Sequence, residues 1–124
     1  MVWWFAKSNE QYRIYGSLQL VGADEPPGSP LQVARKQQWG QLRDQAREQF
    51  YWHTPGLPYE GVAQVPANGR DTDTGKVLPV PDTFLLMLLW PEQVRYLRLT
   101  DNYAQLDELD DATGDGWSRQ RVNA

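Results

Sequence analysis

With 124 residues, the chain is long enough for one domain with a core of its own, so residues 1–124 are expected to form a single domain. Its net charge of −4 and isoelectric point of about 4.9 exclude nucleic acid as a first choice of partner, because phosphate binding needs a basic surface. The chain contains no cysteine, which rules out disulfides, thiolate chemistry and cysteine-ligated metals, whereas its six tryptophans favour a packed core.

The beginning of the chain predicts two strands. Residues 1–5 are apolar, aromatic and β-branched and predict a buried strand, and residues 7–10 form a short polar turn. Because the chain opens directly on a core strand, strands that should pair with it are expected to be missing. The exposed edge at residues 2–6 is therefore expected to pair with another strand, since an open apolar edge promotes association.

Residues 11–21 predict a longer strand with two different faces. Alternation places on one face, which is expected to be core, Tyr12, Ile14, Leu18 and Leu20. It places on the other face, which is expected to meet solvent or a ligand, Gln11, Arg13, Tyr15, Ser17 and Gln19. Gly16 in the middle of the strand indicates a bulge or the close approach of another group.

The centre of the chain predicts a helical pair followed by a long loop. After a loop at residues 21–30, Ser29 and Pro30 are a favourable helix start, with a capping serine before a proline. Apolar residues then recur at helical spacing and predict helices at about 30–39 and 42–51, with a bend at Gly40 and polar side chains on the other faces. Residues 54–82 are rich in proline and glycine and lack periodicity, as in functional or mobile loops.

The last part of the chain predicts four strands. Residues 83–90 read as a strand buried on both faces, 91–93 as a turn, and 94–100 as a half-buried strand. Residues 103–109 and 117–122 predict a hairpin around the acidic turn at 110–116. The apolar run at 84–90 is too short to cross a bilayer, so a soluble, cytoplasmic protein without membrane contact is expected. The element order indicates an α+β domain with a mainly antiparallel sheet.

Four segments in order resemble the pyridoxamine 5′-phosphate oxidase-like FMN-binding family, in the branch common in cyanobacteria and plants. Residues 3–16 match the pattern W-W-F-x-x-S-x-x-Q-Y-R-I-x-G, which is typical of the fourth and fifth strands of that branch. Residues 34–58, 84–99 and 117–124 resemble its helical pair, its next two strands and its C-terminus. The resemblance implies the C-terminal part of an FMN-binding split β-barrel without its N-terminal strands, with two packed helices.

The resemblance also implies a flavin site. Family members are usually homodimers that bind FMN at the subunit interface, and Gln11 stands where the family has a glutamine that contacts the flavin. Arg13 and Tyr15 would line the groove beside Gln11, and His53 and Thr54 stand near a second flavin-contacting segment. The family also has an arginine near its C-terminus that helps to hold FMN. The position of that arginine corresponds to residues 104–106 of this chain, and the best match is Leu106. In the family, the strands whose basic residues bind the phosphate come before the strand that matches Trp3. In this chain, the residues that remain for binding a phosphate are Arg13 and neighbouring helix positions.

Two functions stay open at this point. One is a flavin-dependent oxidoreductase that resembles pyridoxamine-phosphate oxidase and acts on an unidentified small molecule, with no catalytic residue assigned. The other is a non-catalytic split-barrel module for binding or dimerisation that carries no cofactor. The chain is either the C-terminal part of a longer protein or a short relative that depends on a partner chain. No metal site is expected, because the lone His53 and the pair Asp71 and Asp73 lack the further ligands that a metal needs.

Overall fold

The computed structural model describes residues 1–110 and 116–124, which fall into two compact units. The first unit comprises Met1–Gln19 and Leu88–Ala124, and the second comprises Leu20–Met87. The elements in chain order are the strands β1 (Val2–Phe5) and β2 (Glu10–Val21), the helices α1 (Pro30–Gln41) and α2 (Asp44–Glu48), the 3₁₀ turns η1 (Gln49–Tyr51) and η2 (Ala67–Gly69), and the strands β3 (Leu86–Arg98), β4 (Tyr103–Leu109) and β5 (Trp117–Val122). No helix among these residues is long and apolar enough to span a membrane.

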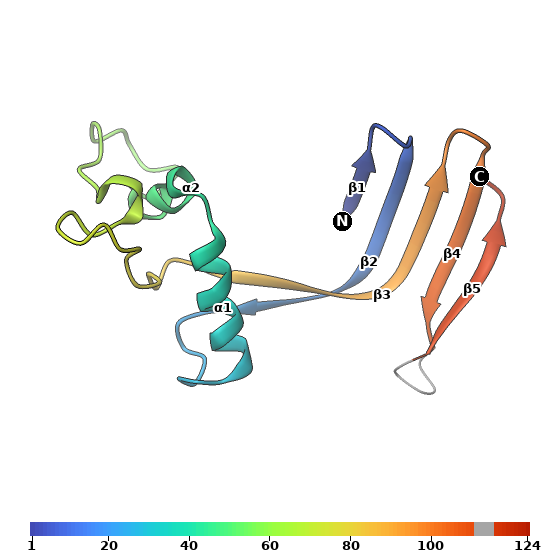
Figure 1. Cartoon of the computed structure of the whole chain (residues 1–124), viewed down its shortest axis with the longest axis horizontal. Coiled ribbons are helices and arrows are strands. Elements are labelled where there is room, and N and C mark those ends of the chain that lie inside the picture. Colours follow the sequence, from blue (N-terminus) through green and yellow to red (C-terminus); the bar gives the residue numbers. More distant parts are fainter. Residues whose placement is uncertain (111–115) are drawn as a thin grey trace. The chain divides into compact units, whose positions relative to one another are not determined.

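The five strands form one sheet in which spatial order follows chain order (Figure 1). β1 pairs antiparallel with β2, β3 with β4, and β4 with β5, so the chain reverses direction between the two strands of each pair. Asn9 and Asn102 adopt left-handed φ values of 53° and 50° at two of these reversals, a conformation that asparagine tolerates better than most residues. The predicted antiparallel sheet and the hairpin at 103–109 and 117–122 are confirmed, whereas most of the predicted acidic turn lies outside the described residues.

One face of the sheet carries a row of aromatic rings, here called the Tyr12 face. Adjacent rings of Phe5, Tyr12, Tyr96 and Tyr103 have centroid distances of 5.8, 4.9 and 6.0 Å, so the row crosses four strands. Such tilted and edge-on contacts stabilise a sheet through cross-strand packing. The expectation that the whole even-numbered side of β2 is core is wrong, however, because Leu18 and Leu20 are each 62% exposed.

The structure corrects the prediction for β1 in one respect. The strand is present, but its residues are exposed rather than buried, with exposed fractions from 46% for Phe5 to 61% for Val2. The physical reason is its position, because β1 is the edge of the sheet and pairs within this chain only with β2.

The structure also corrects the prediction for residues 83–100. The expected turn at 91–93 does not form, and a single strand, β3, runs through Pro91. The prediction of burial on both faces is wrong as well, because Leu85, Met87 and Trp90 are each more than half exposed. Proline within a strand normally marks an irregular point of the ladder. Here Pro91 lies where β3 passes Gly16, whose missing side chain lets the two backbones come close, as the sequence predicts for that glycine.

The helices lie in the second unit, and their start follows the sequence prediction. Ser29 Oγ accepts a hydrogen bond of 3.1 Å from the Gln32 amide, and Pro30 occupies the first turn of α1. The break between the helices comes after Gln41 rather than at Gly40, because Leu42 and Arg43 are both extended. α2 is short and continues into η1.

The core of the second unit forms around Trp39. Its ring packs against Phe50 and Phe84 at centroid distances of 5.6 and 5.3 Å, and its Nε1 donates a 2.8 Å hydrogen bond to the Leu78 carbonyl. Two side chains expected on the polar helix faces, Arg35 and Arg47, are buried instead. Arg35 donates to the carbonyls of Phe84 and Pro81, so the helix and the end of the long 54–82 loop are joined by hydrogen bonds that no local pattern predicts.

Candidate functional site

The candidate site lies in the first unit, on the side of the sheet opposite the Tyr12 face. Gln11 and Arg13 are two residues apart on β2 and therefore project from the same side of the strand. In the register of β3 with β4, Leu97 stands opposite Ala104 and Arg95 opposite Leu106. We call this side of the sheet the Gln11 face.

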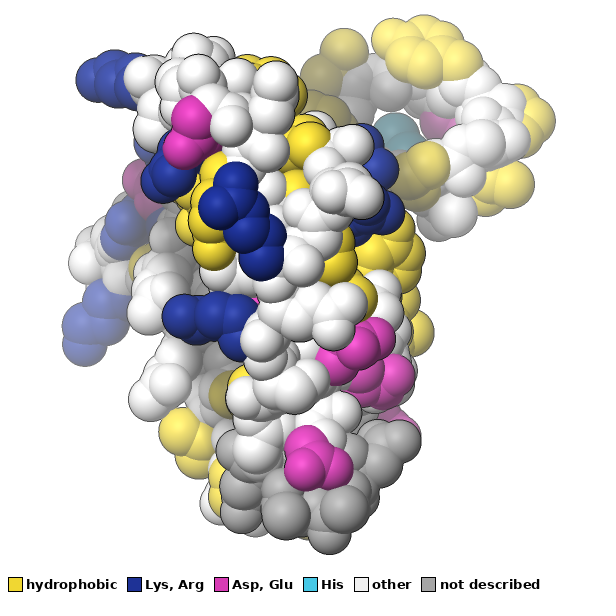
Figure 2. Space-filling view, turned by 90° about the vertical axis from the view of Figure 1, so that its right-hand side faces the viewer, with side chains coloured by type: hydrophobic (Ala, Val, Ile, Leu, Met, Phe, Trp, Pro, Cys, Tyr) yellow, Lys and Arg dark blue, Asp and Glu magenta, His cyan; other side chains and the backbone are white. Residues whose placement is uncertain are grey.

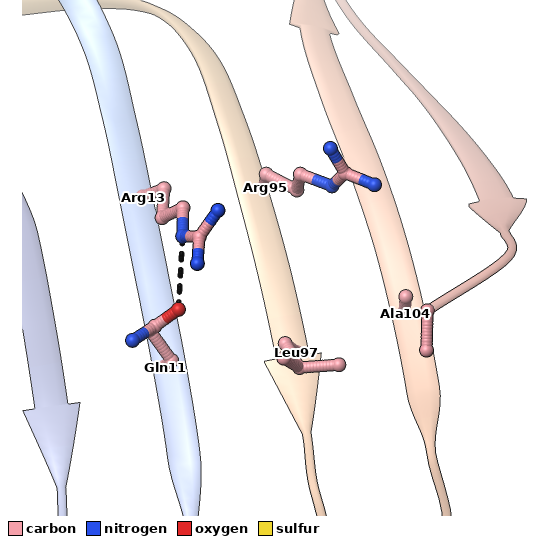
Figure 3. Close-up of a pocket in the computed structure, with 6 residues that line it drawn as sticks. Gln11, Arg13, Arg95, Leu97 and Ala104 are labelled. Atoms are coloured by element: carbon pink, nitrogen blue, oxygen red, sulfur yellow. Dashed lines mark hydrogen bonds between the residues drawn. The ribbon is translucent and has the colours of Figure 1, made fainter.

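The Gln11 face contains a cavity of about 170 Å³ (Figure 3). Side chains from three adjacent strands and the end of the chain line it, and they are Gln11, Arg13, Arg95, Leu97, Ala104 and Ala124. The hydrogen-bond donors come from β2 and β3, while Leu97 and Ala104 supply an apolar surface. Ala104 is 2% exposed, so this surface is part of the packed sheet rather than a mobile rim.

The two arginines of the cavity differ in how they are held. Arg13 Nε donates a 2.9 Å hydrogen bond to Gln11 Oε1, which fixes the guanidinium beside the amide (Figure 3). Arg95 forms no hydrogen bond or ion pair with any residue in the described part of the chain, and its guanidinium extends across β4, away from Arg13 (Figure 3). No Asp or Glu side chain lines the cavity. The side chains of the site therefore present two positive charges and an amide.

Tyr15 extends the site along the same face. It lines an adjacent cavity of about 270 Å³ together with Gln93, Arg95, Leu106 and Val122. Arg95 borders both cavities, so Tyr15 lines a cavity adjacent to the one lined by Gln11 and Arg13. Tyr15 is 54% exposed, so its ring is available to a ligand.

His53 and Thr54 lie in the second unit and line a different cavity. That cavity has a volume of about 370 Å³ and is formed by the loop from Trp52 to Ala63. His53 Nδ1 is 3.4 Å from Glu60 Oε2, and both side chains are at least half exposed. These two predicted residues thus share a loop pocket of their own, which Gln11, Arg13 and Tyr15 do not line.

Sequence reasoning missed Arg95, the residue that borders both cavities of the Gln11 face. Alternation within β3 places Arg95 and Leu97 on one side, but it does not say which residues of β2 they meet. A basic residue on a strand is usually solvated, so no local sequence feature identifies Arg95 as a site residue. Figure 2 shows the β5 edge of the sheet, where basic side chains are numerous, and Arg119 and Arg121 of β5 are exposed there.

Titration in the first unit is shaped by contacts on the Tyr12 face. The Tyr96 hydroxyl donates a 2.8 Å hydrogen bond to Glu10 Oε1, which lowers the pKa of Glu10 and raises the pKa of Tyr96. Arg98 holds the pKa of Asp101 below its usual range through paired hydrogen bonds of 2.9 and 2.7 Å. These carboxylates therefore stay ionised, and their charges are committed to contacts away from the candidate cavity.

Comparison with known proteins identifies relatives, although no protein-family model matches the chain. The sequence is 33% identical over 126 residues to pyridoxine/pyridoxamine 5′-phosphate oxidase 2 of Arabidopsis thaliana, covering 99% of this chain and 61% of that protein. The fold is similar to a crystal structure of a pyridoxamine 5′-phosphate oxidase-related, FMN-binding protein from Nostoc punctiforme. That similarity has a TM-score of 0.77 and 34% identity, and it covers 99% of this chain and 61% of that chain.

The chain thus spans about three fifths of the length of both relatives. Over that span, its antiparallel five-stranded sheet with two helices corresponds to the FMN-binding split β-barrel fold. Sequence and structure agree on the same group of proteins, and over 99% of its length this chain is similar to pyridoxamine 5′-phosphate oxidase-like proteins.

Proposed function

We propose that the chain is an FMN-binding flavoprotein related to pyridoxamine 5′-phosphate oxidase, with the Gln11 face as its cofactor groove. One observation carries the proposal. Gln11, Arg13 and Arg95 line a single cavity of about 170 Å³, together with the apolar side chains of Leu97 and Ala104. The relative from Nostoc punctiforme, described as FMN-binding, supports the choice of cofactor.

The chemistry of these side chains fits FMN. The cofactor offers hydrogen-bond acceptors on its ring carbonyls and its phosphate, and the cavity offers amide and guanidinium donors. The apolar ring surface would meet Leu97 and Ala104. Bound FMN would supply hydride and electron transfer, while the chain's residues would bind the cofactor, orient it and exclude water.

The position of Arg95 adds support. The family resemblance places a cofactor-binding arginine near residues 104–106, and this chain has Leu106 there. In the β3–β4 register Arg95 stands directly opposite Leu106. The neighbouring strand can thus supply a guanidinium at nearly the same place on the sheet face. Arg13 and Tyr15 would complete the groove, and a contribution of His53 and Thr54 to flavin binding stays a prediction.

We also propose that two copies of the chain form a homodimer with FMN at the interface, acting as a flavin-dependent oxidoreductase on an unidentified small molecule. The exposed apolar side chains of β1 support association, because four adjacent large residues on an edge strand are rarely left in water. A location in the cytoplasm stays a prediction.

The test is the absorbance spectrum of the purified chain after incubation with FMN and desalting. Retained yellow colour, with the two absorption bands of oxidised flavin in stoichiometric amount, is the expected result. A protein that stays colourless at saturating FMN would contradict the proposal and favour the non-catalytic binding module.

A further inference from the structure

The second unit contains a cavity that the proposed flavin site does not use. Its volume of about 400 Å³ lies within the range of about 300–1,000 Å³ that is usual for small-molecule sites. Residues of the loop between β2 and α1, of α1 itself and of the end of the long loop line it, and none of them lines the cavities of the Gln11 face. We call it the Arg35 cavity, and its charged lining residues are Glu25, Arg35, Lys36 and Asp82.

Buried hydrogen bonds hold the lining segments of the Arg35 cavity together. Gln32 is 6% exposed, and its Nε2 donates a 3.2 Å hydrogen bond to the Glu25 carbonyl, which fixes the loop before α1 to the helix. Trp39 is 2% exposed, and its bond to the Leu78 carbonyl fixes the long loop to the same helix. The cavity is therefore formed by packed segments whose positions are set before any ligand binds.

Arg35 places a buried positive charge beside this cavity without a carboxylate partner. It is 3% exposed, and its guanidinium donates to the carbonyls of Phe84 and Pro81 at 2.9 and 2.7 Å and to Gln32 Oε1 at 3.3 Å. These acceptors are neutral, and the Phe84 ring at 5.9 Å adds a cation–π contact but no negative charge. Arg35 forms no ion pair with the residues that the structure describes. Because a buried charge is costly until an opposite charge compensates it, a carboxylate in this cavity would supply the missing charge.

The other charged residues of the lining argue against a simple anion. Lys36 adds a second positive charge, but Glu25 and Asp82 add two carboxylates, which would repel an anion and attract an ammonium group. These side chains form no ion pair with one another or with Arg35 in the described part of the chain. A ligand with one positive and one negative group satisfies both kinds of charge. The apolar part of the lining, to which Trp39 contributes, suits an apolar body.

We propose that the Arg35 cavity binds a free α-amino acid with an apolar side chain. The ligand's carboxylate accepts hydrogen bonds from Arg35 and Lys36, and its ammonium group donates to Glu25 and Asp82. Its side chain packs against the ring of Trp39. This site does not depend on FMN, so it stands or fails independently of the proposed function.

The experiment uses the full chain and three probes of similar size. L-phenylalanine has both charged groups, phenylpropanoate has only the carboxylate, and phenethylamine has only the ammonium group. Calorimetry gives the dissociation constants. Spectra of the ¹⁵N-labelled chain locate binding through the indole N–H signal of Trp39, which is assigned by its loss in Trp39→Phe. The indole of Trp52, which lines the loop pocket of His53, is the internal control.

Two variants each remove one charge from an exposed position of the lining, and both are expected to fold. They are Lys36→Gln and Asp82→Asn. The matched controls are Lys76→Gln and Asp73→Asn, at exposed positions of the second unit outside the cavity. Arg35→Lys keeps the buried charge but loses the planar fork. Thermal melting followed by circular dichroism verifies folding, and if Arg35→Lys does not fold, the two exposed variants decide.

The expected result is saturable binding of L-phenylalanine that shifts the Trp39 signal and leaves the Trp52 signal in place. Each single-charge analogue binds at least about tenfold more weakly, as does L-phenylalanine to Lys36→Gln, Asp82→Asn and folded Arg35→Lys, because each change removes a charge-assisted contact. Lys36→Gln weakens phenylpropanoate but not phenethylamine, and Asp82→Asn has the opposite effect. The two control variants bind like the wild type.

Four outcomes would overturn the proposal. The first is the absence of saturable binding of L-phenylalanine, and the second is a Trp39 signal that does not move when it binds. The third is a single-charge analogue that binds as tightly as L-phenylalanine, which would show that the cavity does not recognise both charges. The fourth is an equal loss of affinity in the control variants. Retention of FMN by the same protein is scored separately and changes none of these conclusions.

Discussion

Gly16 in β2 lies directly against the backbone carbonyl of Trp90 in β3. A β-carbon built on Gly16 would be 1.9 Å from the Trp90 oxygen, closer than any two such atoms can lie, and the obstructing atom is backbone that cannot turn aside. The two strands that carry Gln11, Arg13 and Arg95 therefore depend on a glycine at this crossing.

Gly16→Ala is accordingly expected to destabilise the first unit by about 1–3 kcal/mol, the usual cost of overpacking, or more if the strands separate. Urea unfolding followed by circular dichroism measures the change. The matched control is Gly40→Ala in α1, where a new β-carbon meets nothing within 4 Å. That change is expected to raise stability by about 0.5–1 kcal/mol through helix propensity. Equal effects of the two variants would contradict the close approach at Gly16.

Gln11→Leu is expected to weaken FMN binding by about tenfold, because it removes one hydrogen-bonding amide and releases Arg13 from its 2.9 Å contact. Fluorescence quenching of FMN during titration gives the dissociation constant. The control Gln38→Leu changes an exposed glutamine on α1 and should leave the constant unaltered. An unchanged dissociation constant in Gln11→Leu would show that Gln11 does not contribute to FMN binding.

Trp39→Phe tests the hydrogen bond that joins α1 to the long loop. The change removes part of a buried ring, and the Leu78 carbonyl loses its 2.8 Å donor, so a loss of about 1–3 kcal/mol or more in the free energy of unfolding is expected. Thermal melting by circular dichroism gives the value. Trp52→Phe serves as control, because Trp52 is 54% exposed and should change stability little.

The contact of Asp44 with Arg70 in the second unit is expected to be sensitive to acid. Its hydrogen bonds with Arg70, and to a smaller extent Arg47, lower its pKa below the usual value of about 3.9. A carboxylate with a depressed pKa in the folded state stabilises the protein above its unfolded pKa, and this contribution is lost as pH falls through the folded pKa. Asp44→Asn should therefore destabilise the chain at pH 7, and the difference from wild type should shrink below about pH 4.

Urea unfolding of both proteins at pH 7, 5 and 3 measures that difference. Asp82→Asn is the matched control, since Asp82 is exposed and forms no ion pair within the described residues. A difference between wild type and Asp44→Asn that stays constant across this range would show that the contact with Arg70 does not depend on the carboxylate charge.

Association through β1 is expected to respond to charge. Light scattering coupled to gel filtration should show a mass above that of the monomer for the wild type. Trp3→Lys should shift the population toward monomer, because a lysine on an exposed edge strand opposes pairing with another strand. Tyr59→Lys, at a position that is 86% exposed in the second unit, is the control. A wild type that remains monomeric at high concentration would contradict the homodimer.

Local sequence patterns predicted most of the secondary-structure elements and indicated the relatives of the chain. Alternation defined β4 and β5 to the residue, the capping serine and proline defined the start of α1, and the ordered motifs from Trp3 to Ala124 identified the relatives. These features depend on neighbours in the chain, so they can be read without knowing the fold.

Which residues are buried, and which residues meet across strands, depends on the tertiary structure. Local patterns marked β1 and residues 83–90 as core and Arg35 and Arg47 as surface, and the structure reverses these assignments, because burial depends on what else covers an element. The cavity has the same origin. Arg13 and Arg95 are far apart in the sequence and share one cavity because of the pairing of β2 with β3, and strand register is a long-range property that periodicity within one strand does not encode.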